Sequence, residues 1–312
     1  MSARQGLLSV AVAATAWGTG GAVAAVLYDI GGIGPGAVSF WRFSGGLVLL
    51  LLARSFHDRF RRVPADSLLQ VFLENKREVL LAGCGLALYQ TAYFAAVQQV
   101  GLTVATVVTL GTGPVLVALG SRLLLDEPVG IAGVCAAVCG VAGLVLLVCG
   151  ADRAVGPAPA FGLVLAVVSA SGYAGVTLLG RAAGLRRRGS RLTGLVLNFA
   201  VGTLCLLPVA LAEGLLPRAE GLGWTAVSIG YLGLVPTALA YGLFFAGLEV
   251  LSATTVSVVA LIEPLTAAII GVLVLQERLT WGITSGSALV LSAVFFLGRT
   301  SQPEGEVAVG AS

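Results

Sequence analysis

Charged residues are scarce in this sequence, and their scarcity excludes an ordinary soluble domain. Asp, Glu, Lys and Arg together make up 11% of the 312 residues, against roughly 25% in soluble proteins. Hydrophobic residues account for 57%, a further 43 residues are glycine, and the mean hydropathy is +0.99. A water-soluble chain could not hide that much apolar surface, because most of its accessible area must face water. The sequence therefore predicts a chain that crosses a lipid bilayer several times.

Residues that commonly carry enzyme chemistry are also few. The single histidine, His57, lies in a basic segment, and the five cysteines fall in apolar stretches, where we expect them to be small buried packing residues. Cys135 and Cys139 are four residues apart, but two thiols alone make a poor metal site. The sequence has no Gly-x4-Gly-Lys-Ser/Thr loop, which would bind the phosphates of ATP. We therefore expect no metal, no organic cofactor and no ATP-driven step.

Ten apolar segments are each long enough to cross a bilayer as a helix, which takes about 20 residues. The predicted fold class is therefore an all-α membrane protein with ten transmembrane helices. The first segment lacks an Ala-x-Ala cleavage site, so we expect it to be a working span and not a signal peptide. The predicted spans are residues 7–27, 35–53, 79–98, 102–123, 129–148, 160–179, 192–212, 224–248, 252–275 and 279–297.

Positive charge is distributed unevenly over the predicted loops. With a cytoplasmic N-terminus, only Arg153, Arg218 and Arg278 of the 18 Lys and Arg fall in outer loops, and Arg42 falls within the second span. Cytoplasmic loops of membrane proteins carry an excess of Lys and Arg, so this asymmetry predicts cytoplasmic N- and C-termini in a bacterial inner membrane. The basic loops fit this topology and anionic lipid better than nucleic acid.

The second half of the chain weakly repeats the first, with an offset of 150 residues. Residues 94–127 align with residues 244–277 without a gap. A proline and a glutamate, both rare in this chain, recur in register: Pro114 with Pro264, and Glu127 with Glu277. Because each half has five spans, an odd number, the second copy enters the membrane from the opposite side. We expect two inverted repeats at residues 7–149 and 160–298, and a disordered tail at residues 300–312.

These features resemble the paired EamA domains of the drug/metabolite transporter superfamily, and the likeness covers about residues 7–297. The residues that carry it are Trp17-Gly18, Arg42, and the Pro114…Glu127 and Glu263-Pro264…Glu277 blocks. The resemblance implies an inverted-repeat transporter fold, with the fifth and tenth spans at its periphery, and leaves the substrate open. The sixth span departs from the pattern, because Ser171-Gly172 stands where the family often has an aromatic residue like Trp17.

Glu263 lies near the middle of the ninth predicted span, where a charge costs at least ~2.5 kcal/mol. Such a residue is normally shielded within a bundle or a water-filled cavity. Glu263 could bind a proton or an amine during transport. Alternatively, it could be a structural acid that satisfies a backbone carbonyl freed by Pro264. Glu-Pro at this position is common in the family that the chain resembles, which favours the structural interpretation.

Arg42 lies in the outer half of the second span and cannot lose its charge. It could bind a substrate carboxylate, pair with Glu263, or extend towards the outer surface. Asn198 occupies the corresponding position in the second half, because the contexts of Gly46 and Gly202 match. A polar residue at both positions indicates that this face meets protein or water instead of lipid.

Aromatic residues within the spans could form the wall of a pocket, since tyrosine offers both stacking and a hydroxyl group. For any one of them, ordinary helix packing is the alternative. Tyr89 and Tyr93 share one face of the third span because they are four residues apart. Pro114 and Pro264 would soften their helices and are candidate gates. The full set of candidate substrate-binding residues is Trp17, Arg42, Tyr89, Tyr93, Tyr173, Asn198, Tyr241 and Glu263.

The sequence thus predicts a secondary transporter that exports small amino-acid-like or amphiphilic metabolites by alternating access. Its expected partners are a small-molecule substrate and the lipid bilayer, with protons as a candidate coupling ion. The same fold could flip a lipid-linked sugar instead. An intramembrane enzyme is a further alternative, but Asp126-Glu127 is the only adjacent acidic pair and is poorly equipped for such chemistry.

Overall fold

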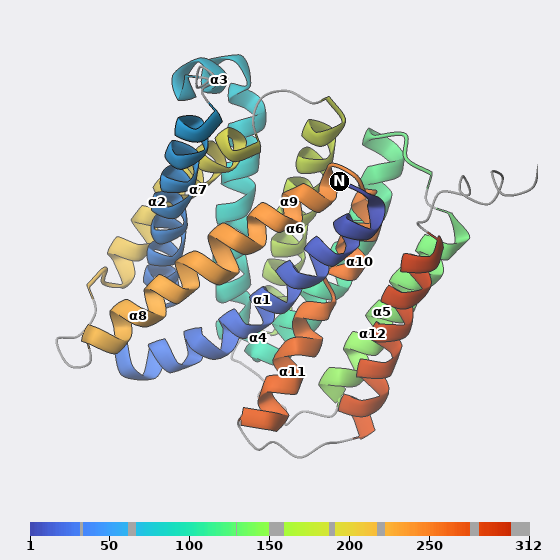
Figure 1. The fold of residues 1–312 in the computed structure, drawn as a ribbon. Coiled ribbons are helices and arrows are strands. Elements are labelled where there is room, and N and C mark those ends of the chain that lie inside the picture. Colours follow the sequence, from blue (N-terminus) through green and yellow to red (C-terminus); the bar gives the residue numbers. More distant parts are fainter. Residues whose placement is uncertain are drawn as a thin grey trace, which may run out of the picture.

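The computed structural model describes residues 1–31, 34–61, 67–128, 130–149, 159–186, 191–216, 222–274 and 281–300, so most of the predicted C-terminal tail lies outside the described residues. Every regular element in these ranges is helical, which confirms the all-helical prediction (Figure 1). The elements are α1 (Ala3–Gly31), α2 (Pro35–Arg61), α3 (Leu68–Glu74), α4 (Lys76–Leu124), α5 (Ile131–Cys149), α6 (Pro159–Arg186), α7 (Arg191–Glu213), α8 (Leu222–Gly233), the π-helix η1 (Leu234–Leu239), α9 (Ala240–Leu248), α10 (Ala253–Val259), α11 (Ile262–Val274) and α12 (Trp281–Thr300).

Five of the described helices are long and apolar enough to cross a membrane. They are Pro35–Phe56, Lys76–Val97, Ala160–Gly184, Arg191–Glu213 and Leu222–Leu248. Shorter apolar helices cover Val108–Leu124, Gly133–Gly143 and Ala253–Ala267. Each of these helices overlaps one predicted span, and the full count of ten stays a prediction.

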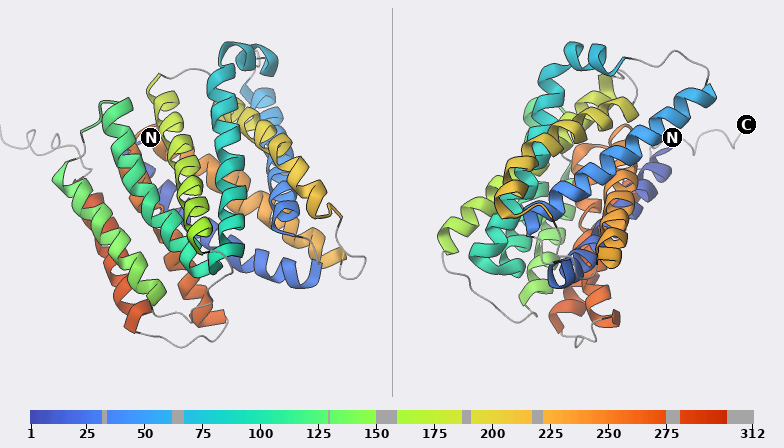
Figure 2. Two further views of the ribbon diagram at one scale, coloured as in Figure 1. Left: turned by 180° about the vertical axis from the view of Figure 1, so that it is seen from behind. Right: turned by 90° about the vertical axis from the view of Figure 1, so that its left-hand side faces the viewer.

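The helix α4 folds back on itself and supplies both the third and the fourth predicted spans. The Ser169 hydroxyl of α6 donates to the Tyr89 carbonyl at 2.8 Å, and one turn earlier on α6 the Ala166 carbonyl accepts from the Thr109 hydroxyl at 3.2 Å. Tyr89 and Thr109 would be about 30 Å apart in a straight helix, so α4 must turn between them. Figure 2 shows its two limbs, coloured cyan and green, diverging from this turn. Both limbs pack against α6.

The helices α2 and α7 run antiparallel past each other, as equivalent spans of an inverted repeat must. At one end, the Gly36 amide donates to Glu213 Oε2 at 2.6 Å. At the other end, Arg54 Nη1 donates to Thr193 Oγ1 at 2.7 Å. Residue numbers thus rise along α2 while they fall along α7. These hydrogen bonds join the two halves of the chain at both ends of one helix pair.

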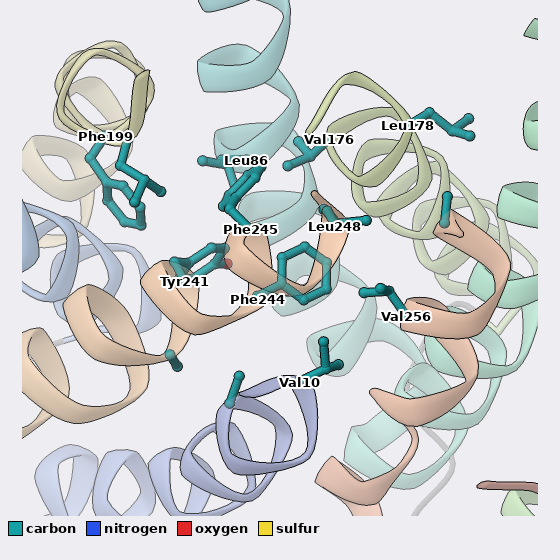
Figure 3. Packing of buried hydrophobic residues seen from close by; sticks show 14 of the residues in the cluster. Val10, Leu86, Val176, Leu178, Phe199, Tyr241, Phe244, Phe245, Leu248 and Val256 are labelled. Carbon is teal, nitrogen blue, oxygen red and sulfur yellow. The ribbon is translucent and has the colours of Figure 1, made fainter. Parts of the chain in front are cut away.

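The bundle has a buried centre around α9 and a peripheral pair of helices. The helices α5 and α12 pack on each other at one edge, at the right of Figure 1. Side chains from α1, α4, α6, α7 and α10 surround α9 (Figure 3), among them Val10, Leu86, Val176, Phe199 and Val256. This places α9, a short helix of the second half, at the centre of the molecule.

The exposure of the cysteines contradicts the expectation that they are buried. Cys84, Cys135 and Cys205 are exposed on the surface of the bundle, so the prediction that they are buried packing residues is wrong. A thiol behaves as a small hydrophobic group and can face lipid at little cost, which makes burial within the protein unnecessary. Cys84 of α4 and Cys205 of α7 bring their sulfur atoms to within 3.8 Å of each other.

This thiol pair gives a direct test of the packing between α4 and α7. Oxidation of the membrane-embedded protein with copper–phenanthroline should produce a disulfide between Cys84 and Cys205, because the sulfurs are already in contact and need only a small side-chain rotation. Peptide mapping by mass spectrometry under non-reducing conditions would detect it. Cys205→Ser is the control that should remove the product. Failure of the two native thiols to cross-link would contradict this helix arrangement.

Candidate functional site

Four of the predicted aromatic site residues meet at the centre of the bundle around Phe244. The ring of Trp17 lies 5.1 Å from Tyr241 and 5.2 Å from Phe244, measured between ring centroids. Tyr173 lies 6.4 Å from Phe244 and 5.8 Å from Tyr89. The rings are tilted or edge-on to one another, as aromatic pairs prefer. Side chains from α1, α4, α6 and α9 therefore form one cluster, which we call the aromatic cluster.

The helix α9 presents this cluster because its aromatic residues recur at helical spacing. Tyr241, Phe244 and Phe245 are separated by three and four positions and so occupy neighbouring places on one side of the helix (Figure 3). Phe244 is a functional candidate that the sequence prediction missed. Its three-residue spacing from Tyr241 was the available signal, since it places the two rings on one face.

Tyr93 and Asn198, the two remaining uncharged candidates, are both half-buried. The ring of Tyr93 packs 5.5 Å from Phe94 and continues the face of Tyr89 towards the turn in α4. Asn198 is on α7, next to Phe199, whose ring lies 5.1 Å from Tyr241. These neighbours place both residues beside the aromatic cluster.

The ninth predicted span is a broken helix, and Glu263 lies at the break. The helix α10 ends at Val259 and α11 begins at Ile262, which puts Glu263 and Pro264 in the first turn of α11. The first N–H groups of a helix have no partner within it, so Pro264 costs no hydrogen bond there. Glu263 therefore lies beside a break in the ninth predicted span, and the role of Pro264 as a gate stays a prediction. Its carboxylate also lies at the positive end of the α11 dipole.

The Glu263 carboxylate forms no hydrogen bond or ion pair with the part of the chain that the structure describes, and the residue is half-buried. It does interact electrostatically with Arg42 and with the hydroxyls of Tyr89, Tyr173 and Tyr241. The predicted structural role, in which this side chain satisfies a free backbone carbonyl, has no hydrogen bond to support it. Glu263 is thus an unpaired acid beside the aromatic cluster.

Arg42 is anchored to the π-helix η1 and not to Glu263. Its Nε donates to Thr237 Oγ1 at 2.8 Å, and its Nη2 donates to the Pro236 carbonyl at 3.2 Å. Of the three alternatives for Arg42, these contacts match neither pairing with Glu263 nor extension to the outer surface, and contact with a substrate carboxylate stays a prediction. They use two of the five N–H donors of the guanidinium.

Two further polar atoms of the aromatic cluster have no partner. The indole Nε1 of Trp17 and the hydroxyl of Tyr173 are buried without a hydrogen bond within the described ranges. Buried polar groups are nearly always paired, so unpaired ones call for an explanation such as a bound molecule. Gly113 packs against the Tyr173 ring, which places the neighbouring Pro114 close to this region. Unlike Pro264, which lies in the first turn of its helix, Pro114 lies in the interior of the second limb of α4.

An ion pair between Glu127 and Arg181 lies near one end of the bundle. Arg181 Nε is 2.6 Å from Glu127 Oε1, and Arg181 Nη1 donates to the Leu248 carbonyl at 3.0 Å. The other oxygen of Glu127 accepts from the Ala253 amide at 3.4 Å, at the start of α10. Glu127 therefore also binds the first turn of α10. The pair joins the two halves of the chain.

Comparison with known proteins gives one family over nearly the whole length. The sequence model of the EamA-like transporter family matches residues 4–149 and 160–299. The uncharacterized transporter YwfM of Bacillus subtilis (strain 168) is 30% identical over 292 residues, which cover 91% of this chain and 90% of YwfM. The protein PecM of Dickeya dadantii (strain 3937) is 34% identical over 206 residues, covering 66% and 67% of the two chains.

A relative from Archaeoglobus fulgidus, also an uncharacterized transporter, is 31% identical over 219 residues, which cover 69% of this chain and 75% of that protein. Among solved structures, a protein crystal structure superposes with a TM-score of 0.77 and covers 96% of this chain and 99% of its own. The two sequences are 20% identical, so this likeness concerns the fold alone.

Proposed function

The chain belongs to the EamA-like transporter family, and we propose that it is a secondary transporter of small amino-acid-like or amphiphilic metabolites. The family and the apolar helices make it a multi-pass membrane protein with the role of a transporter. The two halves, which we place at residues 7–149 and 160–298, would move relative to each other in alternating access. We place the protein in a bacterial inner membrane with both termini in the cytoplasm, on the strength of the charge asymmetry, and favour export.

The observation that carries this proposal is an unpaired acid and an anchored cation beside one aromatic cluster. A zwitterion could offer its ammonium group to Glu263 and its carboxylate to the remaining N–H donors of Arg42. The rings around Phe244 would contact an apolar or aromatic side chain and could stabilise the ammonium group by cation–π interaction. Trp17 Nε1 and the Tyr173 hydroxyl offer further donors to a polar substrate. Proton binding at Glu263 would couple transport to a pH gradient.

A second candidate function is the flipping of a lipid-linked sugar. An apolar groove of about 870 Å³ lies between α4, α6 and α7 and is lined by residues such as Leu88 and Val176. Such a groove could hold an isoprenoid chain. The intramembrane enzyme is less well supported, because the acidic pair Asp126-Glu127 has its glutamate engaged with Arg181.

Transport by the purified protein in proteoliposomes decides between these functions. We expect saturable counterflow of one or more zwitterionic metabolites from a panel of radiolabelled amino acids, amines and organic acids. Uptake should also increase when a pH gradient is imposed. Protein-free liposomes and a set of labelled lipid-linked sugars are the controls. If the protein scrambles the lipid-linked sugar and shows no counterflow of any small solute, the metabolite-transporter proposal is wrong and the flippase function takes its place.

A further inference from the structure

We propose that Thr237 is a positioning residue that holds Arg42 away from Glu263, so that the acid stays free for the cationic group of a substrate. This inference rests on the proposed function of the same site. It assigns a role to the π-helix η1, which the proposed function leaves without one. Single-turn π-helices are rare and frequently occur at functional sites.

The Thr237 hydroxyl has a fixed orientation. Thr237 is completely buried. Its hydroxyl donates its one hydrogen to the Leu232 carbonyl at 2.7 Å and accepts from Arg42 Nε at 2.8 Å. Only a group that is both a donor and an acceptor can make these two bonds together. The Leu232 carbonyl thus turns the oxygen lone pairs of Thr237 towards the guanidinium.

The π-helix supplies the second anchor of Arg42. In an α-helix, the Pro236 carbonyl would accept from the Ala240 amide four residues later. In η1 that amide bonds instead to the carbonyls of Thr237 and Val235. The Pro236 carbonyl accepts from Arg42 Nη2 at 3.2 Å. The π-helix thus presents two acceptors, this carbonyl and the Thr237 hydroxyl, to the inward-pointing arginine.

Close packing of α2 against η1 sets the position of Arg42 along the helix. Gly46 lies one turn after Arg42 and so on the same face. A Cβ added at Gly46 would lie 2.5 Å from Thr237 Cγ2, and one added at Gly233 would lie 3.1 Å from the Gly45 carbonyl carbon. A larger residue at these glycines would push the helices apart. The backbone contact therefore keeps Arg42 within reach of both acceptors.

The anchoring has an electrostatic consequence. Opposite charges in the low-dielectric interior of a membrane protein attract strongly. Arg42 and Glu263 interact electrostatically, yet no direct ion pair joins them. The two hydrogen bonds to η1 oppose that contact. A substrate ammonium group therefore meets a carboxylate that no arginine occupies, and need not displace a preformed ion pair.

Two substitutions of Thr237 separate this role from simple packing. Thr237→Val keeps the shape but removes the hydroxyl, and Thr237→Ser keeps the hydroxyl. We expect Thr237→Val to raise the KM of a zwitterionic substrate about tenfold or more, as the loss of a hydrogen bond to a charged group commonly does. We expect Thr237→Ser to stay near the native KM. Equal KM values in Thr237→Val and the native protein, or a serine variant as impaired as the valine variant, would overturn the proposal.

A second measurement does not depend on transport. A hydrophobic carbodiimide reacts with protonated carboxyl groups inside membranes, and mass spectrometry locates the adduct. We expect Glu263 to react in the native protein and at least several-fold more slowly in Thr237→Val, where Arg42 can pair with it. Glu263→Gln is the control without the adduct. Unchanged labelling in Thr237→Val would overturn the positioning role, whereas slower labelling in a protein that transports no zwitterion would support the positioning role and refute the proposed function.

Discussion

Replacing Glu263 with glutamine should abolish transport driven by a pH gradient while leaving substrate exchange in place. Glutamine has nearly the same shape but cannot take up and release a proton. The Glu263 carboxylate has no ion pair within the described residues, so this change removes no protein contact and should leave the midpoint of thermal unfolding nearly unchanged. A structural acid would give the opposite pattern, with a loss of thermal stability and no specific loss of coupling.

The measurement is uptake with and without a pH gradient, beside counterflow at equal pH, in proteoliposomes with matched protein content. Glu74→Gln is a suitable control, because Glu74 is an exposed acid on the short helix α3 and pairs with Gln70. That variant should behave as the native protein does. Full gradient-driven transport by a well-folded Glu263→Gln protein would remove Glu263 as the coupling site.

Replacing Arg181 with alanine should cause the largest loss of stability. Arg181 and Glu127 form an ion pair in which the side chains are only 13% and 16% exposed. Removing one partner of a buried pair leaves the other charge unpaired and typically costs about 3–5 kcal/mol. The loss also frees the Leu248 carbonyl from its bond to Arg181. We therefore expect a clear fall in the midpoint of thermal unfolding in detergent.

The chain contains its own control for this prediction. Arg191 and Glu249 form a pair with two short hydrogen bonds, but their side chains are 41% and 37% exposed. Exposed pairs contribute about 0–1 kcal/mol, so Arg191→Ala should have little effect. The double variant Arg181→Ala/Glu127→Gln should recover part of the lost stability, because it leaves no buried charge unpaired. An Arg181→Ala protein as stable as Arg191→Ala would contradict the importance of the buried pair.

Several site residues could be predicted because their environment follows from their position along the chain. Glu263 is conspicuous since an acid in a long apolar run has few ways to avoid lipid. Tyr89, Tyr173 and Tyr241 stand out as tyrosines within the spans, and Trp17 stands out through the family resemblance. The structure brings these four rings together.

Other features depended on partners that sequence spacing does not reveal. Arg181 joins Glu127 from 54 positions away, and Thr237 joins Arg42 from 195 positions away. Local patterns identify the face of a helix but not which neighbour that face will meet. For Phe244 the three-residue spacing from Tyr241 indicates a shared helix face, but only the structure shows which rings that face meets.

The sequence by itself determined that the chain lies in a lipid bilayer, that it is helical, and that its two halves share one family pattern. Each of these properties depends on the average character of many residues. Low charge, long apolar runs and two matching blocks can be recognised even where the interpretation of a single residue is wrong. Only the tertiary structure decided that α10 and α11 are separate helices, and that Arg42 bonds to η1 instead of Glu263. Each of these depends on contacts of a few atoms between distant segments. Lipid solvates every apolar helix face almost equally well. The arrangement of the helices is therefore determined by close packing and buried polar contacts.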